Sequence, residues 1–195
     1  MRKGVKLLDR KEFSKDEKPR NIFVYVCELI AESLREHGFK YIKSNNAIIK
    51  KDSQFTYKIS FQPSIKYGST SFLVNISVES DRLAQWRRNE YQGKSVDGMV
   101  VATSLARLTK MKNEWPRYEI ATFTERERVI LEITNIINDY AIPFFEQFND
   151  INLLVKKVEK FGFLPHLKNQ NIIFRRNTIS DFIRCFSSSE SEPFE

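Results

Sequence analysis

The sequence predicts an α+β domain with an N-terminal helix, an antiparallel sheet of about four to six strands, and C-terminal helices packed on one face. Three observations lead to this fold class. Apolar residues recur at helical spacing over residues 21–37 and over residues 124–140, whereas over residues 54–79 they alternate with polar residues. Such alternation is typical of strands that bury only one face.

The first helix is predicted over residues 21–37. Its apolar side chains, among them Ile22, Val26 and Leu29, are spaced three or four residues apart. Pro19 suits the first helical turn, where a missing N–H costs nothing. Gly38 takes the left-handed backbone that ends many helices, so we expect the helix to stop there.

The chain then changes to strands. Residues 39–43 and 47–50 flank Ser44-Asn45-Asn46, a hairpin turn in which Asn tolerates left-handed backbone. Residues 54–61 and 71–79 show the clearest alternation, and we expect Pro63 to end the first of them.

Further short elements follow the two long strands. Asp81 is predicted to cap a helix that runs to Tyr91. Residues 99–108 are apolar and partly β-branched, which favours another strand. Residues 115–120 are predicted to form an edge strand, since Pro116 cannot donate to a ladder.

The second half is predicted to be helical. Thr124 and Glu127 have the spacing of a capping box, and Pro143 is expected to kink or end the helix that follows. A later helix ends at Phe161-Gly162, a short strand is predicted around residues 172–174, and Thr178 with Asp181 is expected to cap a last helix to Phe186.

Four segments are expected along the chain. Residues 1–18 form a basic, partly ordered lead-in, and residues 19–160 form one domain. Residues 161–186 extend from it and pack on it. Residues 187–195, rich in serine and acids, are expected to be disordered.

Composition indicates a cytoplasmic protein. The 195 residues include 32 Lys and Arg against 25 Asp and Glu, a formal charge of +7 with a sequence pI near 9.4. The start lacks the apolar stretch of a signal peptide, and no apolar run is long enough to cross a membrane. Cys27 and Cys185 are too few for a secreted disulfide scaffold, which favours two reduced thiols.

The motifs favour a non-catalytic protein over an enzyme. The sequence lacks the common zinc spacings, both familiar phosphate-binding loops and the serine nucleophile elbow. His37 lies at a helix C-terminus and His166 in a loop without a neighbouring acid. Glu79 and Asp81 end a strand, where a cap and an ion pair are more common than a magnesium site. We therefore expect no catalytic residue, metal or cofactor.

Basic residues around the first hairpin are the remaining signal. With the polar positions of the adjacent strands they define a candidate binding face. Its members are Lys40, Lys43, Lys50, Lys51, Lys58, Thr56 and Asn75. Cations on one face can bind phosphates, but lysines on hairpins and edge strands also keep sheets from pairing with each other.

Several short pieces in order resemble a family of uncharacterised bacterial proteins, domain of unknown function 4304. They are Gly38-Phe39, Phe61-Gln62, the alternating residues 72–76, Leu105-Ala106-Arg107-Leu108, and residues 140–145. The resemblance covers roughly residues 24–148 and implies a small α+β bacterial protein. It implies no established activity, cofactor or catalytic residue.

Two functional classes remain open at this point. The first is a non-catalytic binding or protein-interaction protein that meets its partner through the polar sheet face or the basic hairpin. The second is a nucleic-acid-associated protein that uses the basic patches around that hairpin. The sequence indicates no membrane partner and leaves the oligomeric state open.

Overall fold

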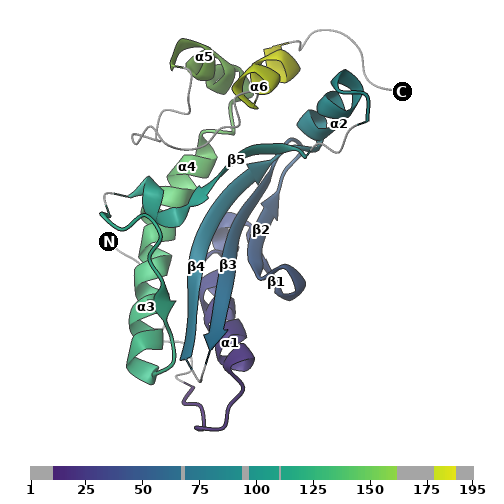
Figure 1. The fold of residues 1–195 in the computed structure, drawn as a ribbon. Helices are drawn as coiled ribbons and strands as arrows, with labels where there is room; N and C mark the ends of the chain where they lie inside the picture. The colour runs from purple at the N-terminus through teal and green to yellow at the C-terminus, as the bar shows by residue number, and fades with distance from the viewer. Residues whose placement is uncertain (1–10, 67–68, 94–96, 110, 162–177, 188–195) are drawn as a thin grey trace. The chain divides into compact units, whose positions relative to one another are not determined.

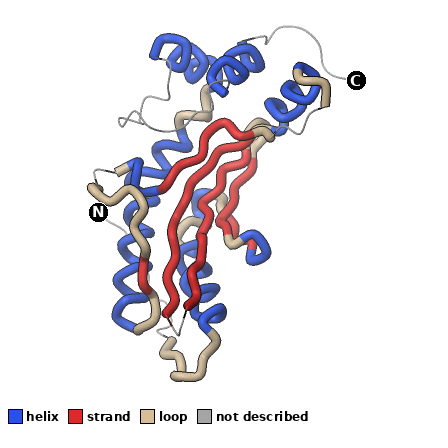
Figure 2. Tube along the Cα trace, viewed as in Figure 1, coloured by secondary structure: helices blue, strands red, loops and turns tan. Residues whose placement is uncertain are grey.

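The computed structural model describes residues 11–66, 69–93, 97–109, 111–161 and 178–187. Six strands form one sheet in the order β1-β2-β3-β4-β5, with β6 paired to β4 (Figures 1 and 2). The strands are β1 (Lys40–Ile42), β2 (Ala47–Lys51), β3 (Thr56–Lys66), β4 (Ser69–Glu79), β5 (Met99–Ser104) and β6 (Tyr118–Glu119). The α-helices are α1 (Pro19–Glu32), α2 (Asp81–Glu90), α3 (Phe123–Ile136), α4 (Ile142–Glu146), α5 (Ile151–Phe161) and α6 (Thr178–Ser187). The predicted α+β class is confirmed.

The chain divides into two compact units. Unit 1 comprises Met1–Lys50, Lys58–Ile76 and Ser104–Ala141; unit 2 comprises Lys51–Tyr57, Ser77–Thr103 and Ile142–Glu195. The predicted division at residues 18, 160 and 186 stays a prediction. Four predicted features lie outside the described residues: positions 1–10 of the lead-in, His166, the strand around residues 172–174, and positions 188–195 of the tail.

Helix α1 of unit 1 begins at Pro19 as predicted but ends at Glu32, earlier than the pattern indicated. The hydroxyl of Ser33 donates to the carbonyl of Ile30 over 2.7 Å, and the chain tightens into a 3₁₀ turn, Arg35–His37. Gly38 ends that turn at φ +82°, so the predicted left-handed glycine is confirmed.

Aromatic side chains form the core between the helices and the sheet of unit 1. The ring of Phe72 on β4 lies 5.9 Å from Phe23 on α1, 5.5 Å from Phe61 on β3 and 5.9 Å from Tyr118 on β6. Burying each large apolar side chain contributes about 1.5–3 kcal/mol. Helix α3 contacts both α1 and β6, and Figure 1 shows α1 and α3 on the same face of the sheet.

The prediction that Pro63 ends its strand is wrong, because β3 continues to Lys66. Strand β2 lies on one side of β3, and the amide of Phe61 donates to the carbonyl of Asn46, the residue just before β2. Residues of β3 beyond Phe61 therefore extend past the end of β2. A proline without an N–H is tolerated there because no ladder partner faces it.

Two predicted helix caps are shifted by one turn or less. The capping box of α3 is formed by Thr122 and Glu125 rather than by Thr124 and Glu127; the Thr122 amide donates to the Glu125 carboxylate over 2.9 Å. Helix α2 in unit 2 is capped by Ser80 rather than Asp81. In both cases the hydroxyl nearest to the free amides of the first turn makes the cap.

Another predicted boundary also differs. The strand predicted over residues 99–108 ends at Ser104, whose hydroxyl accepts from the Ala106 amide and starts a 3₁₀ turn. Pro143 is expected to kink or end its helix, and the regular helix α3 ends before it, at Ile136. The chain widens into a π turn over Ile137–Ala141 and continues as α4, an arrangement that accommodates the missing N–H of Pro143.

In unit 2, aromatic side chains from distant positions meet around Phe55. Its ring lies 5.3 Å from Phe148 and 5.7 Å from Phe186 of α6, while Tyr57 lies 5.3 Å from Phe145. The side chains of Phe144, Phe145 and Phe148 are all buried. Helix α6 contacts both α5 and α2 within this unit.

Candidate functional site

The hairpin of unit 1 distributes its side chains between two faces. Strands β1 and β2 are antiparallel, with Lys40 opposite Ile49, Tyr41 opposite Ile48 and Ile42 opposite Ala47. Asn46 takes left-handed backbone at φ +47°, which confirms the predicted turn. Because side chains alternate along a strand, Tyr41 and Ile48 point to the helix-covered face and Lys40 and Ile49 to the other.

Three predicted site residues of unit 1 lie on this second, open face. Lys40 is exposed, whereas Lys58 on β3 and Asn75 on β4 are half-buried between residues that point to the core. The Asn75 side-chain oxygen is buried and has no hydrogen-bond partner within the described part of the chain. The structure therefore brings Lys40, Lys58 and Asn75 to one face of the sheet.

Two further predicted residues of unit 1 do not belong to that face. Lys43 lies in the 3₁₀ turn after β1, where its carbonyl accepts a hydrogen bond from Arg20 over 3.4 Å. Lys50 lies two positions from Ile48 and so shares its face; its ammonium is 5.8 Å from the Phe39 ring centroid, a cation–π contact.

The remaining two predicted residues, Lys51 and Thr56, belong to unit 2. The Lys51 ammonium lies 2.7 Å from the Asp81 carboxylate, and this bond raises the pKa of Lys51. Thr56 begins β3 and is half-buried. The seven residues of the predicted face are thus divided between the two units, and in unit 1 Lys43 and Lys50 lie off the open face.

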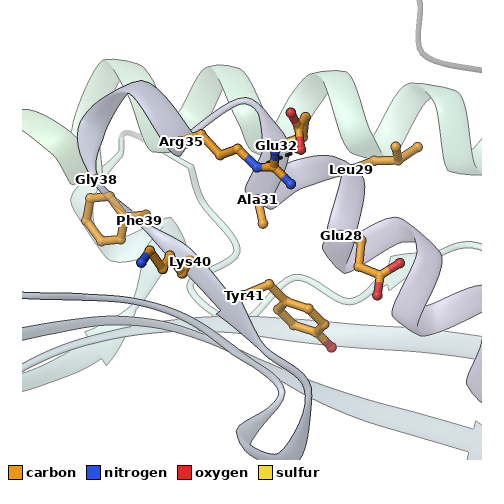
Figure 3. Close-up of a pocket in the computed structure, with 9 residues that line it drawn as sticks. All are labelled: Glu28, Leu29, Ala31, Glu32, Arg35, Gly38, Phe39, Lys40 and Tyr41. Carbon is orange, nitrogen blue, oxygen red and sulfur yellow. Dashed lines mark ion pairs between the residues drawn. The ribbon is translucent and has the colours of Figure 1, made fainter.

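A groove of about 780 Å³ lies beside β1 in unit 1 (Figure 3). Helix α1 forms one wall, and the chain entering β1 forms the other. Its lining residues are Glu28, Leu29, Ala31, Glu32, Arg35, Gly38, Phe39, Lys40 and Tyr41. Glu32 and Arg35 neutralise each other, with 2.8 Å between Oε2 and Nε. The sequence pattern indicates Lys40 but not the groove, since the walls of the groove come from two elements.

Tyr41 lines this groove together with Glu28 (Figure 3), and it also lies close to Cys27. Its hydroxyl oxygen is buried and lies beside the Cys27 thiol. Burial, together with the neighbouring Cys27 thiol, raises the pKa of Tyr41 above its ordinary value. Burial likewise raises the pKa of Cys27. Both groups are therefore neutral at physiological pH.

Unit 2 contains a buried polar network that the sequence analysis did not find. Arg87 Nε lies 2.8 Å from Asp181 Oδ2, and the Tyr91 hydroxyl donates to Asp181 Oδ1 over 2.6 Å. A second Arg87 nitrogen donates to the carbonyls of Asp97 and Met99. The predicted cap of α6 by Thr178 and Asp181 stays a prediction. The pairing of Asp181 with Arg87 has no local sequence signal, because 94 positions separate them.

In the part of the chain that the structure describes, the cysteines, histidines and carboxylates do not form a recognisable catalytic or metal-binding arrangement. Cys27 and Cys185 are buried and form no disulfide, and burial raises the pKa of both thiols, so neither is an activated nucleophile. His37 lies in the exposed turn after α1. Within the described ranges, no three His, Cys, Asp or Glu side chains come together in a way that could hold a metal ion.

A helix that crosses a bilayer must be both long enough and apolar enough. Among the described residues, none of the helices meets both requirements.

The class of protein that these features define is a small α+β domain in which a helix and an edge strand border a groove. The chain belongs to a family described as a domain of unknown function (DUF4304), whose model matches residues 30–147. The matched range contains the first hairpin, both long strands and α3, which confirms the family resemblance read from the sequence. No curated protein and no solved structure matches the chain.

Proposed function

We propose that this protein is a non-catalytic domain that binds another protein through the surface beside β1. The observation that carries this proposal is the position of β1 at the end of the strand order, next to the groove along α1. An edge strand has backbone groups free for pairing with another chain. Lysine at an edge can discourage such pairing, but the groove leaves space for a partner segment beside Lys40.

The distribution of cations favours a protein partner over nucleic acid. A phosphate backbone is bound by cations gathered along one surface. Here Lys50 turns to the helix-covered face and stacks on Phe39, whereas Lys51 pairs with Asp81. The groove is lined by acidic as well as basic residues. The carboxylates on the α1 wall would repel phosphate.

Site-specific photo-crosslinking in the native host tests this function. A photoreactive phenylalanine analogue replaces Ile42, which is partly exposed on β1, and in a control variant it replaces the exposed Glu146 on α4. We expect one protein to be captured from position 42 and not from position 146. Capture of nucleic acid, or the same pattern at both positions, would contradict the proposal.

A further inference from the structure

The register of the hairpin shows which backbone groups of β1 point away from β2. In an antiparallel ladder, the N–H and C=O of one residue point to the same neighbouring strand, and the direction alternates along the chain. Asn46 bonds to Phe61 and Asp52 bonds to Phe55, so the even-numbered residues of β2 face β3. Ile48 therefore faces β3 and makes no ladder bond to its partner Tyr41.

It follows that the N–H and C=O of Tyr41 point away from β2. Among the described residues, no hydrogen bond to these two groups is found. An added strand could accept from this N–H and donate to this C=O, which is the chemistry of β-strand addition. The groove of about 780 Å³ is lined by Lys40 and Tyr41 of β1 and by residues of α1, so it borders the strand that carries these groups.

Charges on the two walls define what the added segment should carry. With Glu32 paired to Arg35, Glu28 is the lining carboxylate without an ion-pair partner in the described part of the chain. It lies close to Tyr41, whose buried hydroxyl oxygen can accept a hydrogen bond. Arg20 is also near Tyr41, but it is bonded to the Lys43 carbonyl and stacked on Phe23.

Side chains of an added strand alternate in the same way as those of β1. The residue opposite Tyr41 would point to the helix-covered face, toward Glu28, and the next residue would point to the open face, beside Lys40. Opposite charges directly across neighbouring strands stabilise their pairing. The groove therefore fits a partner segment in which a basic residue is directly followed or preceded by an acidic residue.

We propose that the groove binds an extended segment of a partner protein as an added strand on β1, with a Lys or Arg side chain at Glu28 and an adjacent Asp or Glu at Lys40. The inference rests on the proposed function and names its partner chemistry. It commits to a segment from another protein rather than a second copy of this chain or its own residues 1–10.

A display library of random dodecapeptides, selected against the immobilised full chain, provides the probe. We expect enriched peptides to contain neighbouring basic and acidic residues. Failure to enrich any peptide above the unselected library overturns the inference, whereas the photo-crosslinking result decides the proposed function independently. A dimer in light scattering that excludes the selected peptide also overturns it.

N-methylation of the selected peptide at alternate residues then tests strand addition. One peptide is methylated at the residues whose N–H groups face β1, and a second peptide at the residues whose N–H groups face away from it. Each methyl group removes one N–H donor. Since each lost hydrogen bond weakens binding several-fold, we expect the dissociation constant to rise about tenfold or more in one frame and to change little in the other. Equal effects in both frames overturn strand addition while leaving protein binding intact.

Charge exchange tests the assigned side chains. Glu28→Lys should weaken the selected peptide about fivefold or more, and changing its basic residue to Glu should restore binding to this variant. Glu146→Lys makes the same change on an exposed helical position outside the groove and should have no effect. Equal weakening by both variants, or absence of rescue, overturns the assignment.

Discussion

The guanidinium of Arg87 on α2 donates to the carboxylate of Asp181 on α6 over 2.8 Å, and both side chains are buried. The same helix pair also carries an exposed ion pair, in which Arg184 lies 2.6 Å from Glu90. One pair of helices in unit 2 thus contains a buried and an exposed ion pair whose contributions can be compared directly.

Asp181→Ala is expected to lower the free energy of unfolding by about 3 kcal/mol, because it removes the buried carboxylate partner of Arg87. Only the more exposed Asp97 carboxylate, 3.3 Å from Arg87, then pairs with this buried charge. Urea denaturation followed by circular dichroism measures this loss. Glu90→Ala, the matched control, removes the exposed pair and should cost about 1 kcal/mol or less. Equal losses in the two variants would show that the buried pair has no special role.

Buried tyrosines should make the protein sensitive to alkali. Burial raises the pKa of Tyr118 to about 12, and burial with a hydrogen bond to Asp52 raises the pKa of Tyr57 still further. Free tyrosine ionises near pH 10. The folded state favours the neutral phenols, so this stability is fully present below about pH 10 and is lost as the pH rises above it.

An absorbance titration at 295 nm with parallel circular dichroism checks this expectation. Tyr57 and Tyr118 should ionise only together with the loss of helical signal. Tyr57→Phe should remove part of the pH dependence above pH 10, since its side chain cannot ionise. Complete ionisation of all seven tyrosines with the helical signal intact would refute the prediction.

The position of the capping box of α3 can be tested by two alanine substitutions. Thr122 accepts from the Glu125 amide, so Thr122→Ala should destabilise the protein by about 1 kcal/mol. Thr124 is exposed inside the first turn, and Thr124→Ala should change stability little. Thermal unfolding of both variants provides the comparison, and a larger loss at Thr124 would place the cap where the sequence pattern alone put it.

Neither cysteine should react in the folded protein. Cys27 and Cys185 are buried, and burial raises the pKa of each thiol, which suppresses the reactive thiolate. With an aromatic disulfide reagent, we expect labelling at the rate of unfolding and release of two equivalents in denaturant. Rapid labelling of one thiol under native conditions would contradict the burial of that residue.

Local chemistry was sufficient to predict most elements of the fold. The alternating residues around Phe72 and Val74 form a strand, and Gly38 and Asn46 take the left-handed backbone expected of them. Boundaries were less predictable, because two neighbouring hydroxyls can each satisfy a helix end. Thr122 and Thr124 both fit a capping pattern, and only the position of the first free amides selects between them.

The candidate site was predictable only in part. Lys40 was identified, but Lys50 was grouped with it although Lys50 faces the other side of the sheet. Glu28 and Tyr41 were missed because they come from a helix and a strand that lie close together only after folding.

The order of residues by itself determined the fold class, the strands and the left-handed turns, since these depend on periodicity and on backbone preferences within a few positions. Tertiary structure decided which charges pair, which strand lies at the edge and where a groove opens. These properties arise between segments that are distant along the chain, such as Arg87 with Asp181 and α1 with β1, and no local pattern encodes their distance in space.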